Sequence, residues 1–68
     1  MAPKTALGLA ISALMEERAK YAFNANLYKS GVVTLDTVKA AKVYARYTAA
    51  IDRLKEMLKT APKSEYYQ

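Results

Sequence analysis

Histidine and cysteine are both missing from this sequence of 68 residues. Without cysteine the chain has no disulfides and no thiolate metal ligands. Without histidine it lacks the side chain that most often binds metals or exchanges protons near neutral pH. Helical di-iron bundles need Glu-x-x-His pairs, so that class is excluded as well. We therefore predict that the protein is not an enzyme and that it holds no metal and no cofactor.

Acidic side chains are few, with six in the chain, and four of them form two close pairs. Glu16 with Glu17, and Asp52 with Glu56, both fall where exposed helix faces are expected, so neither pair indicates general acid and base chemistry. The two glycines do not form a Gly-rich phosphate loop. The sequence therefore offers no constellation typical of catalysis.

Two glycines and two prolines leave most of the chain uninterrupted, which favours long helices. Between residues 5 and 30, apolar side chains recur at steps of three and four, the spacing of a helix that lies along another helix. This first stripe consists of Leu7, Ala10, Ile11, Leu14, Tyr21, Ala25 and Tyr28. We expect one continuous helix from about residue 5 to residue 30.

A second stripe with the same spacing predicts a helix from about residue 35 to residue 60. Its members are Ala40, Tyr44, Tyr47, Ile51, Leu54 and Leu58. Pro62 disfavours helix in the residue before it, so the helix should end there. The tail of residues 62 to 68 has no apolar periodicity and is predicted to be mobile; docking of Tyr66 and Tyr67 on a neighbour is the alternative.

The segment between the two stripes carries strong turn signals. Gly31 suits the left-handed conformation that ends a helix, with Val32 placed to contact Leu27 in a Schellman closure. Thr34 suits the cap of the next helix, and Asp36 lies in its first turn, near the positive end of the helix dipole. A turn limited to residues 31 to 34 places two helices side by side and antiparallel.

These elements predict an all-α fold, a two-helix antiparallel hairpin, as a single domain over residues 1 to 68. In such a hairpin, facing residues have numbers that sum to about 64, which sets Leu14 near Ala50 and Ile51. The architecture resembles small dimeric hairpin bundles, a likeness of fold that assigns no function.

A chain of this length buries a small share of its surface, and natural small scaffolds are reinforced by disulfides, a metal or a partner subunit. Since the sequence excludes the first two, self-association remains. Leu9, Phe23 and Leu27 lie outside the main stripe, which indicates a second buried contact. We therefore predict that the hairpin dimerises into a four-helix bundle, with these three residues at the interface.

Some polar groups fall within the apolar stripes. Arg18 lies in the first stripe, where its alkyl stem is expected to pack while its guanidinium reaches the edge of the seam; binding of an anionic ligand is the alternative. Four of the six tyrosines also lie in the stripes. They are expected to be core residues and not a stacking platform for nucleic-acid bases.

Basic side chains outnumber acidic ones by eleven to six, which gives a net charge of +5. Four of them form a ridge on the second helix, opposite its apolar stripe: Lys39, Lys42, Arg46 and Arg53. Such a ridge is typical of a solvated helix face, and it also suits contact with a nucleic-acid backbone. No DNA-binding or RNA-binding motif accompanies it.

The apolar run from Ala6 to Met15 follows Lys4 and superficially resembles the front of a secretory signal. The helical pattern continues through Glu16 and Glu17, which favours a helix of the folded domain. The run is far shorter than a bilayer requires, so no membrane span is predicted. The absence of cysteine gives no evidence for an oxidising compartment, so a cytoplasmic location is expected. Peripheral membrane contact by this segment ranks third among the functions considered.

We interpret the sequence as a small non-enzymatic interaction or structural module that acts through helix–helix association, with a second copy or with a partner protein. The alternative is a small nucleic-acid-binding regulator that uses the basic ridge. The first interpretation is favoured because the apolar residues outside the main stripe indicate a buried contact, whereas a basic ridge is also typical of an ordinary solvated helix face.

Overall fold

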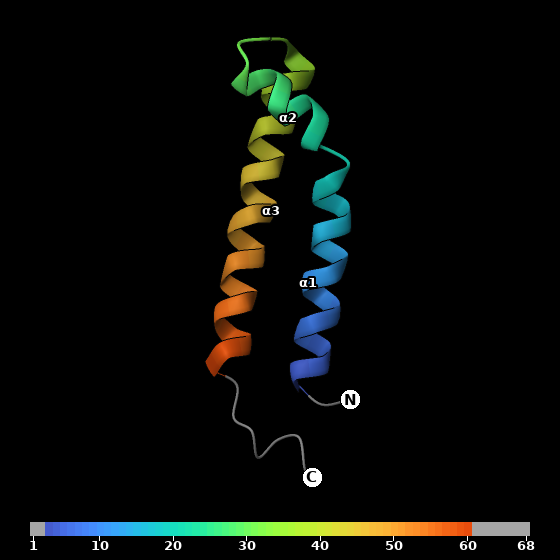
Figure 1. The fold of residues 1–68 in the computed structure, drawn as a ribbon, viewed down its shortest axis with the longest axis vertical. Coiled ribbons are helices and arrows are strands. Elements are labelled where there is room, and N and C mark those ends of the chain that lie inside the picture. Colours follow the sequence, from blue (N-terminus) through green and yellow to red (C-terminus); the bar gives the residue numbers. More distant parts are fainter. Residues whose placement is uncertain (1–2, 61–68) are drawn as a thin grey trace.

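The computed structural model describes residues 3–60, and this part of the chain is all-helical, which confirms the predicted class. It contains α1 (Pro3–Ala19), α2 (Ala22–Lys29) and α3 (Leu35–Thr60). α1 and α2 follow one another along α3, which runs in the opposite direction (Figure 1). The result is a rod of 51 × 17 × 13 Å. The tail predicted to be mobile lies outside the described residues.

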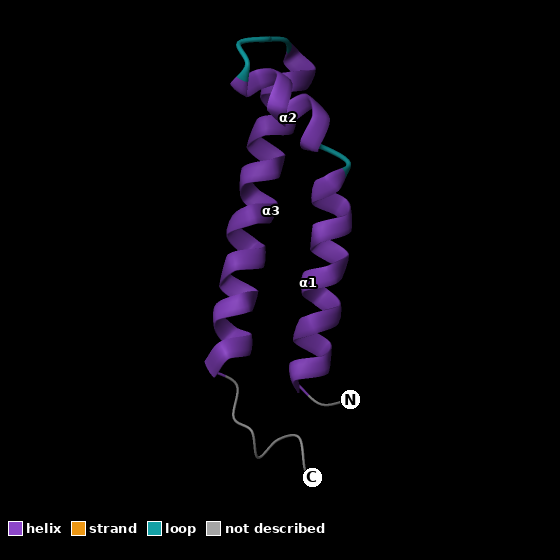
Figure 2. Cartoon of the chain, in the orientation of Figure 1, coloured by secondary structure: helices purple, strands orange, loops and turns teal. Residues whose placement is uncertain are grey.

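The prediction of one continuous helix over residues 5 to 30 is wrong, because α1 ends at Ala19 and α2 begins at Ala22. At the break, the Lys20 N–H donates to the Glu17 carbonyl at 3.2 Å, and the Tyr21 N–H donates to the Arg18 carbonyl at 3.0 Å. Both bonds reach three residues back instead of four, which tightens the backbone and redirects it. The two-helix hairpin is therefore not what the described residues form: they form three helices (Figure 2).

The break contains neither glycine nor proline, so its cause is not local propensity. The residues beside the break make specific contacts with α3. Arg18 donates a hydrogen bond to the Thr48 hydroxyl at 3.0 Å, and the Tyr21 ring stacks on the Tyr47 ring with centroids 6.1 Å apart. We attribute the break to these contacts, because tertiary contacts override helix propensities of a few tenths of a kcal/mol per residue.

The loop between α2 and α3 has the closure that the sequence predicts. Gly31 adopts a φ of +99°, its N–H donates to the Tyr28 carbonyl at 3.0 Å, and the Val32 N–H donates to the Leu27 carbonyl at 2.9 Å. These two bonds constitute a Schellman motif. They satisfy the last carbonyls of α2 and turn the chain toward α3.

The first turn of α3 is capped by two threonines that bond each other reciprocally. The Thr37 N–H donates to Thr34 Oγ1 at 3.1 Å, and the Thr34 N–H donates to Thr37 Oγ1 at 2.8 Å. The Thr37 hydroxyl in turn donates to the Val32 carbonyl at 2.7 Å, and the residue is 3% exposed. Thr37 thus takes the position that glutamate or glutamine occupies in a capping box, and it ties the cap to the preceding loop.

The core of the rod is thin. Its buried apolar residues, among those described, are Ile11, Ala25, Ala40 and Ile51. They come from α1, α2 and α3, so both apolar stripes contribute to one seam, but the two alanines add little volume. Most other members of the stripes are half-buried. Much apolar surface therefore stays in contact with solvent in the single chain.

Candidate functional site

The three residues predicted at an oligomer interface occupy different environments. Leu9 on α1 is 56% exposed and Phe23 on α2 is 74% exposed, whereas Leu27 is half-buried beside the Schellman closure. An exposed phenylalanine on a helix of a small protein is a candidate for contact with another molecule.

Sequence reasoning missed the apolar side chains around the loop. Val33 is 69% exposed and Leu35 is 91% exposed, although both flank the capped start of α3. The signal that could have found them is position: residues of a tight turn at the end of a long rod have few neighbours to cover them.

All four residues of the basic ridge are exposed along α3. The structure brings Lys39, Lys42 and Arg46 together beside one shallow groove of about 430 Å³, which Leu35, Val38 and Val43 also line. Arg53 lies two turns beyond Arg46 and does not line this groove. Among residues 5–60, no carboxylate forms an ion pair with any of the four.

The ion pair found within that range joins Lys20 and Glu17 at 3.1 Å, next to the break between α1 and α2. The hydrogen bond from Lys20 to the Glu17 carboxylate, together with the charge of that carboxylate, raises the pKa of Lys20 above its ordinary value of 10.5. Both side chains are largely in solvent, so the pair has little effect on stability.

Arg18 is a structural residue. Its guanidinium bonds the Thr48 hydroxyl and lies 5.2 Å from the centre of the Tyr44 ring, a cation–π arrangement. The sequence places this group at the edge of the seam, and in the structure its partners there come from α3. These contacts favour the structural interpretation of Arg18 over the anionic-ligand alternative.

Most tyrosines of the two apolar stripes also make contacts between the packed helices. The Tyr21 and Tyr47 rings are stacked with an interplanar angle of 27°, and Tyr44 lies under Arg18. Tyr28 differs, because 42% of it is exposed. It is therefore the stripe tyrosine best placed to contact another molecule.

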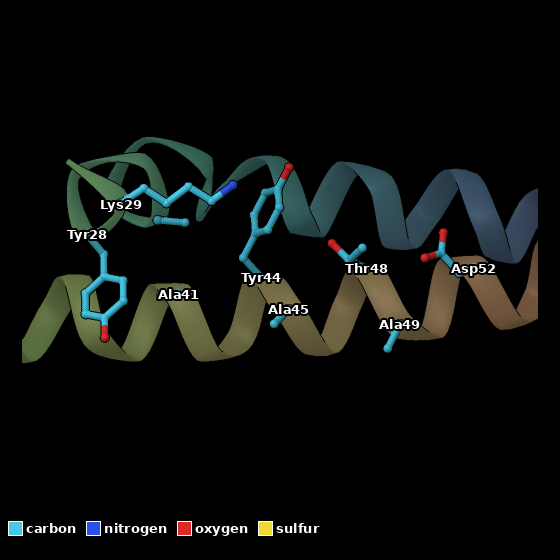
Figure 3. A pocket seen from close by; sticks show the side chains of 9 residues that line it. Tyr28, Lys29, Ala41, Tyr44, Ala45, Thr48, Ala49 and Asp52 are labelled. Carbon is cyan, nitrogen blue, oxygen red and sulfur yellow. The ribbon is translucent and has the colours of Figure 1, made fainter. Parts of the chain in front are cut away.

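Tyr28 borders a groove of about 530 Å³ between α2 and α3 (Figure 3). The lining is rich in alanine, with two tyrosine rings and one residue of each charge: Ala25, Tyr28, Lys29, Ala41, Tyr44, Ala45, Thr48, Ala49 and Asp52. It contains no pair of groups arranged for proton transfer or nucleophilic attack. We call it the α2–α3 groove.

A second groove, of about 460 Å³, lies where α1 meets α2 along α3. Leu14 and Tyr21 line it together with Val43, Tyr47 and Ala50. These neighbours follow the register expected from the sequence, in which Leu14 lies near Ala50. The groove is a gap in the seam, and its aromatic walls are the rings already stacked on each other.

Two further observations concern metal-ligating clusters and membrane-spanning helices in the described part of the chain. Residues 3–60 contain no cluster of three or more metal-ligating acidic side chains. None of the helices in this range combines the length and the apolar character needed to cross a bilayer.

Comparison with known proteins adds no assignment. No protein-family model matches the chain, and no curated protein or solved structure shows significant similarity to it. Function must therefore be argued from the surfaces described above.

Proposed function

We propose that this protein is a non-enzymatic interaction module that acts through helix–helix association, with a second copy of itself or with a partner protein. The observation that carries this proposal is the exposure of Phe23, 74% of which is in solvent, above a core with few fully buried side chains. Burial of apolar area stabilises a complex by about 25 cal/mol per Å². A chain that leaves this much apolar surface exposed gains substantially from a second surface.

In the simplest assembly two copies form a four-helix bundle. Each copy contributes α3 as one arm and the successive helices α1 and α2 as the other arm. Leu9 and Phe23 then lie between the copies, with Leu27 at the edge because it is already half-buried in the single chain. This assembly supplies the second buried face that the single chain lacks. A cytoplasmic location stays a prediction.

The mass of the protein in solution tests this proposal. We expect light scattering to give at least twice the chain mass of 7.5 kDa. Phe23→Glu should weaken association at least about 30-fold, since truncating an aromatic hot spot costs about 2 kcal/mol or more. Asn26→Glu makes the same change of charge on an exposed neighbour in α2 and should leave the mass unchanged. A wild-type monomer at all concentrations would overturn the homodimer.

A second candidate function has one observation in its favour. The ridge of Lys39, Lys42, Arg46 and Arg53 is exposed and free of carboxylate partners among residues 5–60. Four cations in contact with duplex phosphates give an affinity that falls with salt, with a slope of about −3.6 in a log–log plot. Contact of this kind would make the protein a small nucleic-acid-binding regulator.

A gel shift with mixed duplex and single-stranded nucleic acids tests this alternative. The double variant Lys42→Glu with Arg46→Glu should abolish binding at low salt while leaving the helical circular dichroism intact. The double variant Lys55→Glu with Lys59→Glu changes the net charge equally, but it lies off the ridge and should retain binding. Equal loss in both variants, or no shift for the wild type, would remove the alternative.

A further inference from the structure

We propose that the α2–α3 groove is a contact between two copies of this chain, in which each copy places its α3 antiparallel against the α3 of the other (Figure 3). The inference rests on the proposed function, because it names a second copy as the partner. It uses a different surface from that of Leu9 and Phe23, so the two can fail separately.

The floor of the groove is shaped for a helix. Ala41, Ala45 and Ala49 recur at steps of four along α3, so they form one row on its surface. Ala45 and Ala49 are exposed. Side chains that end at Cβ let a second helix axis come close, because the distance between packed helices is set by the side chains at the contact. The α3 helix of a second copy carries the same row of alanines and can pack closely against this floor.

Tyrosine supplies the apolar area that alanines lack. Tyr28 projects from α2 beside the alanine row and keeps 42% of its surface exposed (Figure 3). Its ring offers a rigid contact with a polar tip, which is why tyrosine is enriched at protein interfaces. A second helix laid in the groove covers this ring.

Charge selects the partner and its direction. Lys29 lies at the end of the groove near Ala41, and Asp52 lies at the opposite end, beyond Ala49 (Figure 3). Neither side chain forms an ion pair within residues 5–60. A two-fold axis across the middle of the groove, between Ala45 and Ala49, brings the Lys29 of each copy to the Asp52 of the other. A parallel arrangement sets like charges against each other instead.

The antiparallel contact is thus isologous: one patch meets itself, so this contact taken alone closes at two copies. Together with the contact through Leu9 and Phe23 it gives each chain two self-complementary surfaces, so the wild type should assemble beyond a dimer, and loss of either contact should leave a dimer. Each ion pair occurs twice in the dimer, so one substitution in the chain affects both. An acidic or basic partner of another kind would be matched at one end of the groove and repelled at the other. A second copy is matched at both ends.

Charge reversal followed by rescue tests the pairing, with sedimentation equilibrium as the measurement. Lys29→Glu and Asp52→Lys should each weaken dimerisation at least about tenfold, because each converts both attractions into repulsions. The double variant should regain most of the wild-type affinity. Lys39→Glu makes the same charge change as Lys29→Glu on the other side of α3, outside the groove, and should have little effect. Circular dichroism checks that every variant stays helical.

Single cysteines test the direction, and the chain offers a clean background because it contains none. With the two-fold axis between Ala45 and Ala49, the two Ala45 positions of the dimer lie about 6 Å apart along the direction of the helices, and the two Ala41 positions lie about 18 Å apart. A short bismaleimide should therefore cross-link Ala45→Cys into dimers and leave Ala41→Cys uncoupled. Equal cross-linking at both positions would show a parallel contact and overturn the inference.

The outcomes separate this inference from the proposed function. Dissociation by Phe23→Glu, with neither charge reversal having any effect, would support the function and overturn the groove contact. Loss in both single reversals without rescue in the double variant would likewise overturn the pairing, since it would leave the groove to a different occupant. A wild-type monomer at all concentrations would overturn both the groove contact and the homodimer.

Discussion

Two places in this molecule redirect the chain, and they do so by different means. The loop between α2 and α3 is encoded locally: Gly31 has the positive φ, and Thr34 and Thr37 cap the next helix. The break between α1 and α2 has no such residues. Instead, Arg18 beside it donates a hydrogen bond to α3, and the Tyr21 ring stacks on a ring of α3. A turn of the first kind forms from its own residues, whereas one of the second kind depends on the rest of the fold.

The largest expected effect concerns the buried hydroxyl of the loop. Thr37→Val keeps the shape of the side chain but leaves the Thr34 N–H and the Val32 carbonyl without their partner, which should cost about 1–3 kcal/mol. Urea unfolding followed by circular dichroism measures this cost. Thr60→Val removes an exposed hydroxyl that bonds carbonyls of its own helix, and it should change stability by less than about 0.5 kcal/mol. Equal effects would contradict the local encoding of the loop.

The two glycines should respond with opposite signs. Gly31→Ala forces a Cβ onto a residue with a φ of +99°, at a cost of about 1–2 kcal/mol. Gly8→Ala lies inside α1 with open space around the new Cβ, and it should stabilise the protein by up to about 1 kcal/mol. The same unfolding measurement compares them. A neutral Gly31→Ala would mean that the left-handed residue is not needed to end α2.

The break should show a smaller effect, one that is visible as coupling. A double-mutant cycle of Tyr21→Ala and Tyr47→Ala should give a coupling free energy of about 0.5–1.5 kcal/mol, because the rings stack across the seam. A parallel cycle of Tyr21→Ala with Tyr28→Ala pairs two residues for which no mutual contact is found, and it should be additive. Additivity in the first cycle would contradict our attribution of the break to contacts with α3.

The smallest effect is expected at the ion pair beside the break. Glu17→Gln should leave the unfolding midpoint unchanged at neutral pH, since Lys20 and its partner are largely solvated. The raised pKa of Lys20 means that any contribution is complete below pH 10.5 and is lost as the pH rises through the higher folded value. Wild type and variant should therefore coincide between pH 6 and pH 9, with ~0 difference throughout. A clearly lower unfolding midpoint of the variant in this pH range would show that the ion pair also stabilises the break, in addition to the contacts of Arg18 and Tyr21.

What could be predicted from the sequence follows the same division. α3 begins at Leu35, as expected from the cap at Thr34, because this signal acts through its own backbone, and it continues to Thr60, the last described residue. The stop predicted from Pro62 lies outside the described residues. The division of the first helix could not be predicted, because residues 18 to 22 have ordinary helix-forming composition and the cause lies on α3.

The candidate surfaces divide in the same way. The off-stripe positions of Leu9 and Phe23 could be identified by counting, and both are exposed; Leu27 has the same pattern but is half-buried. The alanine row of α3 is visible in the sequence. Its enclosure by Tyr28 and Lys29 is not, because that depends on where the break directs α2.

The short length of α2 has a consequence for how the molecule opens. Eight residues are too few to hold a helix in water without support, so α2 keeps its form because α3 lies against it. Its amide protons should therefore exchange with solvent together, in one step, whenever this segment separates from α3. Those of mid-α3 should exchange more slowly, so that α2 opens before the middle of α3 does.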